Sequence, residues 1–264
     1  MGFFDAMKTD KLGKQAYNAH VQANDLQRRG KVADARKKYD EALELYRQAY
    51  DAGCRKTGIL MSYSVLMMRY GMFAEARELM KEISAIGGMS EEVHFELRVN
   101  YSICLWRLGI LDEAIKTIDY ASKFARNSSY FSSACTYYVE RAAHSGSDAD
   151  FEAAHALLDE AMDYDDEDAA TLDNYGEYFS RLCEREADPE RKAELRRSAV
   201  DYYERAYKQK PSQITTLYAL ANFAREDGDI QRARELVDKA LLHSSSRVCP
   251  VSPEMLKELK AQLA

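Results

Sequence analysis

One spacing of residues recurs along the whole chain and restricts the folds open to it. A turn glycine is followed five residues later by alanine, then after four more by a bulky apolar residue, and after three more by a small or apolar one. The clear copies are Gly30-Ala35-Tyr39-Ala42, Gly71-Ala76-Met80-Ile83, Gly109-Ala114-Ile118-Ala121 and Gly228-Ala233-Val237-Ala240. Two copies lack the glycine, namely Ala154-Leu158-Ala161 and Ala199-Tyr203-Ala206. Successive copies end 34 to 45 residues apart, a period typical of helical repeat arrays.

The spacing also predicts how the helices pack. Residues three and four apart lie on one face of a helix, and small residues on that face let two helices approach closely. The preceding helix carries its own small residue seven positions before each turn glycine, at Ala23, Ser64, Ser102 and Ala221. The pattern therefore predicts antiparallel helix pairs, in a chain of about thirteen helices without strands.

The fifth copy carries the resemblance to a known family. Residues 198–207 read Ser-Ala-Val-Asp-Tyr-Tyr-Glu-Arg-Ala-Tyr, and Lys210-Pro211 follows where a helix-ending proline is expected. This stretch resembles the tetratricopeptide repeat. The resemblance implies an all-α fold, a right-handed α-α superhelix of about six helix pairs.

The expected array covers residues 1–251, with units near 8–53, 56–88, 91–126, 129–165, 167–210 and 212–243. Ser252-Pro253 places a capping side chain before a proline at the first helical position, so residues 252–264 are expected to form a helix that caps the stack. Phe3, Phe4, Met7 and Leu12 are expected to cover the other end, with a short amphipathic membrane anchor as the alternative.

Composition narrows the classes of function. A formal net charge of −7 argues against nucleic acid as the main partner, because phosphate binding needs clustered Lys and Arg. The five cysteines form no C-x-x-C pair, and the histidines form no H-E-x-x-H pair, so neither a disulfide framework nor a metal site is indicated. No signal peptide, membrane span, phosphate loop or nucleophile elbow is present. We therefore expect a cytoplasmic, non-enzymatic protein without a cofactor or a metal.

The resemblance implies a binding groove on the concave face, lined by the first helix of each pair. The residues three, six and ten positions before a turn glycine should point into it. In the second and third units these are Met68, Val65, Met61, Trp106, Ile103 and Val99. An exposed apolar strip of this kind usually marks an interaction site. The alternative is that these six residues are buried between the pairs.

The corresponding positions at the two ends are polar or mixed: Gln27, Asn24 and His20 in the first unit, and Arg225, Asn222 and Tyr218 in the sixth. Arginines recur two residues before the glycine, at Arg28, Arg69 and Arg107, and Arg181 takes the matching place in the fifth unit. Such a row can bind the carboxylates of an acidic peptide. The alternative is that each arginine binds no partner and only stabilises the last turn of its own helix, where a positive charge is favourable.

These features favour a scaffold or adaptor that binds a protein or peptide segment. The segment is expected to be acidic if the arginine row binds it. No nucleic acid or membrane is expected as a partner, and homo-oligomers are compatible with such an array. One alternative is a peptide-sensing regulator of the same repeat class. Another is an enzyme whose site is assembled only by folding.

Overall fold

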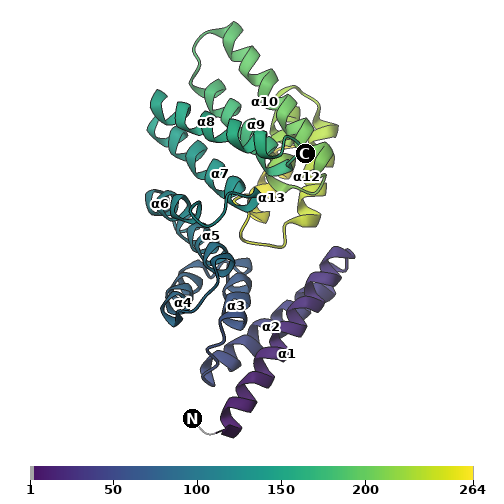
Figure 1. Ribbon diagram of the computed structural model, residues 1–264. Coiled ribbons are helices and arrows are strands. Elements are labelled where there is room, and N and C mark those ends of the chain that lie inside the picture. The colour runs from purple at the N-terminus through teal and green to yellow at the C-terminus, as the bar shows by residue number, and fades with distance from the viewer. Residues whose placement is uncertain (1–2, 264) are drawn as a thin grey trace. The chain divides into compact units, whose positions relative to one another are not determined.

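The computed structural model describes the backbone of residues 3–263 and the side chains of residues 9–263. This part of the chain contains thirteen α-helices and no strand, as the spacing predicted (Figure 1). The helices are α1 (Phe3–Arg28), α2 (Val32–Asp51), α3 (Thr57–Arg69), α4 (Phe73–Ile86), α5 (Glu91–Arg107), α6 (Leu111–Ala121), α7 (Ser128–Ser145), α8 (Asp148–Tyr164), α9 (Ala169–Arg185), α10 (Pro189–Gln209), α11 (Ile214–Glu226), α12 (Ile230–His243) and α13 (Pro253–Gln262).

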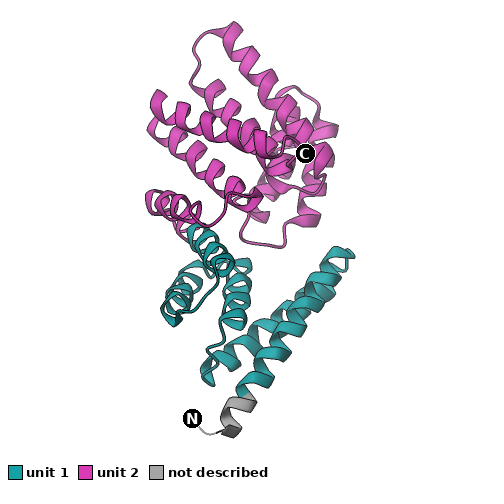
Figure 2. Cartoon of the chain, in the orientation of Figure 1, with its two compact units in different colours: residues 1–104 teal, residues 105–264 magenta. Residues whose placement is uncertain are grey.

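Neighbouring helices pack as pairs, most extensively α1 with α2, α7 with α8, α9 with α10 and α11 with α12. Contacts between Cα atoms divide the chain into two compact units, residues 1–104 and residues 105–264 (Figure 2). The boundary falls inside α5, so we describe each unit by itself.

The predicted turns lie at the four predicted glycines. Gly30, Gly71, Gly109 and Gly228 all have positive φ, between 72° and 79°, a conformation that strains residues with a Cβ. At each turn the next residue's N–H bonds to the carbonyl oxygen five residues back, as Lys31 does to Leu26 at 2.9 Å. This geometry is the Schellman motif, which satisfies carbonyl groups at the end of a helix.

The small residues of the pattern lie at the helix crossings. Each alanine five positions after a turn glycine is at most 1% exposed, and so are the alanines of the two copies without glycine: Ala35, Ala76, Ala114, Ala154, Ala199 and Ala233. The small or apolar residues that close each copy are equally buried: Ala42, Ile83, Ala121, Ala161, Ala206 and Ala240. A larger side chain at these positions would push the paired helices apart.

One close contact in unit 2 joins the last two pairs. Tyr203 of α10 is 2% exposed, its hydroxyl donates to Glu177 of α9 at 2.9 Å, and its ring centroid lies 6.2 Å from that of Phe223 in α11. A Cβ at Gly176 would come within 2.7 Å of the Tyr203 ring. Arg196 of α10 adds a second link, because it donates to Asp227 at 2.7 Å, just after α11.

The C-terminal helix begins where the sequence predicted. Ser252 is the N-cap of α13, accepting from Met255 N–H at 3.1 Å, and Pro253 follows at the first helical position. Leu256, Leu259 and Leu263 pack into the apolar cluster formed by α11 and α12. At the other end, the side chains of Phe3, Phe4 and Met7 lie outside the described residues, and Leu12 is partly buried.

Candidate functional site

We use the term first-helix face for the side chains that lie three, six and ten residues before the turn of each pair. The six apolar residues predicted there do not form one exposed strip. Met61, Met68 and Val99 are buried, with exposures of 8%, 2% and 8%, while Val65 is 40% exposed. Ile103 and Trp106 are partly buried.

Burial on several sides of the helix explains this departure. Seven of the thirteen residues of α3 are buried, because a helix inside a stack packs against its own partner and against neighbouring pairs. The expectation that Met61, Met68 and Val99 face solvent is therefore wrong, and their burial between helices, the alternative, is what the structure shows. Of the six residues, Val65 is the most exposed.

Two residues of the predicted arginine row also have partners inside their own units. Arg69 donates to Gln27 Oε1 at 2.6 Å, and its guanidinium lies 4.0 Å from the ring centroid of Tyr39. Burial lowers the pKa of Arg69 and that of Arg107, whose guanidinium lies 5.6 Å from the ring centroid of Trp106. Both side chains remain charged at neutral pH because an arginine pKa starts far above it.

The polar end predicted in the first unit is an internal network. Asn24 Oδ1 accepts from the Tyr39 hydroxyl at 2.7 Å, and His20 Nδ1 lies 3.4 Å from the Tyr46 hydroxyl. Burial and the nearby Arg69 both lower the pKa of His20, so its ring is neutral at pH 7. These side chains bind α1 to α2, and His20 is only 9% exposed.

Trp106, near the end of α5, contacts both a polar and an aromatic group of α7. Its indole N–H donates to Glu140 of α7, and its ring centroid lies 5.7 Å from that of Tyr137. The guanidinium of Arg107 interacts electrostatically with Glu140, which raises the pKa of Arg107 against the effect of burial. The tryptophan is thus held by a carboxylate that also interacts with the arginine that follows it in the sequence.

The most perturbed carboxylate on the first-helix face was not predicted. Asp173 of α9 accepts hydrogen bonds from the hydroxyls of Thr215, at 2.7 Å, and Thr216. Burial raises the pKa of Asp173 to about 6, and the nearby Glu177 acts in the same direction. No Lys or Arg of the described part lies within 4 Å of Asp173, so only neutral hydroxyl and amide donors stabilise its charge.

The same counting rule that placed Trp106 would have found this group. Arg181 takes the place two residues before the turn in the fifth pair, so the positions six and ten residues before the turn are Glu177 and Asp173. The turn glycine is missing from this pair, so these positions can be counted only from Arg181. Glu177 bonds to Arg181 at 2.7 Å, so one arginine of the predicted row has an internal acidic partner.

The sixth pair carries the remaining predicted residues. Tyr218 and Asn222 are both partly exposed, and the Asn222 amide donates to the Tyr218 carbonyl oxygen at 2.9 Å. The thiol of Cys249, in the connection between α12 and α13, lies close enough to Asp173 and Arg107 for both to influence its pKa.

No group of three or more metal-ligating side chains occurs among the residues described. No helix in the same part of the chain is long and apolar enough to cross a membrane.

Comparison with known proteins places the fold. A family model described as tetratricopeptide repeat matches residues 185–247. A monomeric IFIT1 mutant with Gppp-AAAA has a TM-score of 0.62 and 17% identity over 84% of this chain and 49% of that one. The human IFIT1 dimer with PPP-AAAA gives 0.59 and 17% over 79% and 48%. This chain thus spans about half the length of the IFIT1 chains.

A third structure, matched over nearly its whole length, shares the fold as well. TTC0263, a thermophilic tetratricopeptide-repeat protein of Thermus thermophilus, has a TM-score of 0.52 and 17% identity over 76% of this chain and 94% of that one. Comparison with curated protein sequences finds no match. Residues 185–247 thus match the tetratricopeptide repeat, and the thirteen helices, the turn spacing and the similar structures show an all-α helical repeat fold for the described chain.

Proposed function

We propose that the chain is a non-enzymatic scaffold or adaptor that binds a protein or peptide segment on the first-helix face of unit 2. The observation that carries this proposal is a row of polar side chains on three successive first helices. It comprises Glu140 on α7, Asp173 and Glu177 on α9, and Asn222 on α11.

The helices that carry this row are joined side by side. Thr136 of α7 donates to Asn174 of α9 at 3.0 Å, and Thr215 of α11 donates to Asp173. A continuous face of this kind suits an extended partner segment, because its helices are already packed side by side before the segment binds.

The charges on this face favour a partner segment with basic or neutral groups. Glu140 and Asp173 place carboxylates on this face, and Asp173 accepts from neutral hydroxyl donors, whereas Arg69 and Arg107 lie against aromatic rings of their own units. An acidic segment, which the arginine row suggested, would meet carboxylates instead. Opposite charges at an interface raise the association rate and exclude like-charged competitors.

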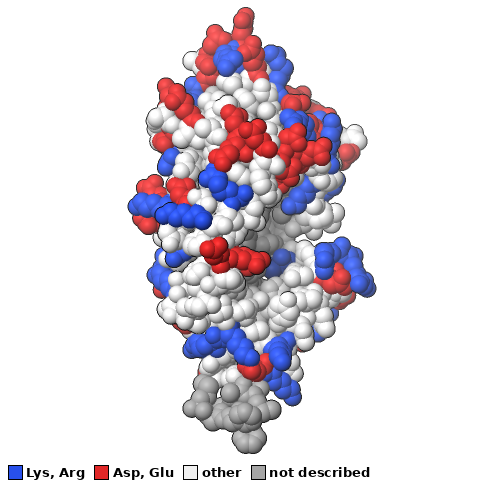
Figure 3. All heavy atoms as spheres, in the orientation of Figure 1, with Lys and Arg blue, Asp and Glu red and all other residues white. Residues whose placement is uncertain are grey.

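Nucleic acid is the less suitable partner. The IFIT1 structures named above hold PPP-AAAA and Gppp-AAAA. In this chain the formal net charge is −7, and the face drawn in Figure 3 mixes acidic and basic side chains without a continuous basic patch. We therefore favour a protein partner.

Affinity purification of the tagged chain from its host, followed by mass spectrometry and calorimetry with the purified partner, tests the proposal. The double substitution Tyr218→Ala and Asn222→Ala should weaken the Kd about tenfold or more, as loss of central interface residues does. The matched control, Asp201→Ala with Lys208→Ala, changes exposed residues on α10 and should leave the Kd unchanged. Equal binding by both double variants would contradict the assigned face, and the absence of any specific partner would contradict the function.

A further inference from the structure

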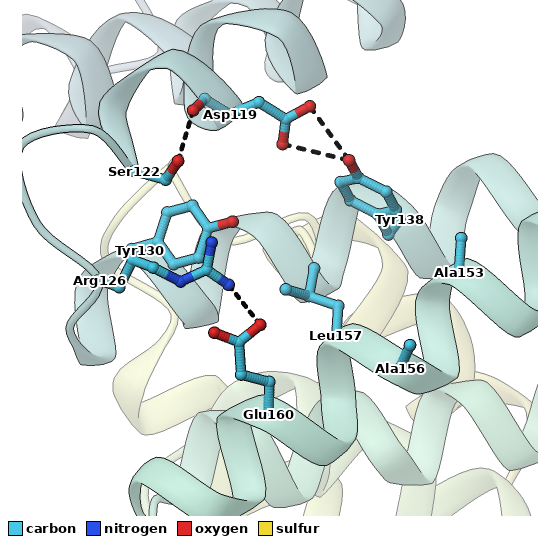
Figure 4. A pocket seen from close by; sticks show the side chains of 9 residues that line it. All are labelled: Asp119, Ser122, Arg126, Tyr130, Tyr138, Ala153, Ala156, Leu157 and Glu160. Carbon is cyan, nitrogen blue, oxygen red and sulfur yellow. Dashed lines mark hydrogen bonds and ion pairs between the residues drawn. The ribbon is translucent and has the colours of Figure 1, made fainter.

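Unit 2 also contains a pocket away from the first-helix face, with a volume of about 340 Å³ (Figure 4). Its walls come from α6, the connection after it, α7 and α8. The lining residues are Asp119, Ser122, Arg126, Tyr130, Tyr138, Ala153, Ala156, Leu157 and Glu160.

The part of the α8 wall formed by Ala153, Ala156 and Leu157 is apolar. Leu157 projects beside two alanines, Ala153 and Ala156, which leave open space where longer residues would fill it (Figure 4). Tyr130 is 3% exposed and presents its ring on the opposite side. Such walls suit an aliphatic chain rather than a strongly hydrated group.

The arginines near the pocket already have partners. Arg126 forms an ion pair with Glu160, and its guanidinium lies 4.7 Å from the Tyr130 ring centroid. Arg141 lies 4.6 Å from the ring centroid of Tyr138 and pairs with Asp150 at 3.1 Å. These pairings leave neither guanidinium as an open site for an anion.

Asp119 differs from the other charged groups of the pocket. Its carboxylate accepts from the Tyr138 hydroxyl, at 3.2 and 3.1 Å, and has no Lys or Arg within 4 Å in the described part of the chain. Burial raises the pKa of Asp119, while Tyr138, Arg141 and Arg126 act in the opposite direction. A half-buried carboxylate without a close counter-ion is stabilised when a cation reaches it.

We propose that this pocket binds a lysine or arginine side chain of a protein partner, with Asp119 as its counter-ion and the α8 wall against its aliphatic stem. This inference rests on the proposed function, because it assigns part of the partner's sequence. The lining contains two carboxylates and one guanidinium, so its formal charge is complementary to a cation.

A peptide titration tests the pocket without the natural partner. The probe is acetyl-Gly-Arg-Gly-amide, followed by amide chemical shifts of the ¹⁵N-labelled full chain, and its control carries citrulline, a neutral residue of similar shape, in place of arginine. The arginine peptide should shift the amides of Ala153, Ala156 and Leu157. The citrulline peptide should bind about tenfold or more weakly, as expected for a lost charge-assisted hydrogen bond.

Variants of the chain separate charge from shape. Asp119→Asn should reduce arginine-peptide affinity about tenfold or more, whereas Asp112→Asn, which removes the same charge from an exposed site on α6, should not. Ala156→Leu fills the open space without changing charge and should also abolish binding. Thermal unfolding measured by circular dichroism checks that each variant is folded. Equal affinity for the arginine and citrulline peptides, or full binding by folded Asp119→Asn, would overturn the proposal.

Partner capture distinguishes this failure from failure of the proposed function. If the unmodified chain captures a specific partner and Asp119→Asn binds it with the same Kd, the pocket assignment is wrong and the scaffold function stands. If no partner is captured while the arginine peptide still binds at the α8 wall, the pocket stands and the assigned function is wrong.

Discussion

Replacing Asp173 by Asn tests whether the first-helix face of unit 2 contains a carboxylate whose charge is costly to bury. The substitution keeps the size of the side chain and an oxygen that can accept from Thr215 or Thr216. It removes only the titrating charge. Because burial raises the pKa of Asp173 from 3.8 to about 6, the folded chain holds a proton that the unfolded chain releases over this interval.

The sign and size of the effect follow from this linkage. The stabilisation by the protonated form is fully present below pH 3.8 and is lost as pH rises to about 6. A shift from 3.8 to about 6 corresponds to about 3 kcal/mol, at about 1.4 kcal/mol per pKa unit. The free energy of unfolding of the unmodified chain should therefore fall relative to that of Asp173→Asn by up to about 3 kcal/mol across this interval.

Urea unfolding followed by circular dichroism, in small pH steps from below to above this interval, measures the difference. Subtracting the two curves removes every titrating group that the proteins share. It also removes any constant effect of the amide on the hydroxyl network. Parallel curves over the whole range would refute the reasoning, because they would mean that Asp173 titrates alike in the folded and unfolded chains.

Three other predictions concern stability. Gly176→Ala should lower the free energy of unfolding by about 2 kcal/mol, because its Cβ would overlap the Tyr203 ring. Gly30→Ala should lower it by about 1 kcal/mol, from backbone strain alone. Urea unfolding compares the two variants, and an unchanged stability of Gly176→Ala would contradict the close packing at this position. Trp106→Ala should cost about 2–3 kcal/mol, since it removes packing and an indole hydrogen bond; strong acrylamide quenching of the unmodified protein would argue against this partly buried position. Ending the chain at Val251 should lower the melting temperature and promote aggregation by exposing the apolar cluster beneath α13; an unchanged, soluble product would show that α13 is only a tail.

The helix pairs could be predicted because local and pairwise constraints coincide in the repeat. A glycine with positive φ ends the first helix of five pairs, and alanine at the crossing is needed wherever two backbones come close. Gly71 and Ala76, for example, mark a turn and a buried crossing by themselves. Neither the turn nor the buried crossing depends on how one helix pair packs against the next.

The binding face was harder to predict because exposure depends on neighbouring pairs. Met68 and Arg225 both lie three residues before a turn glycine, yet Met68 is 2% exposed and Arg225 is only partly buried. Counting along one helix predicts which way a side chain points. It does not predict whether a neighbouring pair covers that side chain. Asp173 was missed for a different reason, since its pair lacks the glycine from which positions are counted.

The contacts of α10 have a consequence for how unit 2 folds. In a simple repeat array each pair adds its own stability and an interface with its neighbour. Tyr203 and Arg196 of the fifth pair also contact the sixth pair, through Phe223 and Asp227. Separating the two pairs therefore removes the Phe223 ring from Tyr203 and breaks the bond between Arg196 and Asp227. The backbone amides of α9, α10, α11 and α12 should exchange with solvent in one cooperative step, so that residues 169–243 form a single folding unit rather than two repeats.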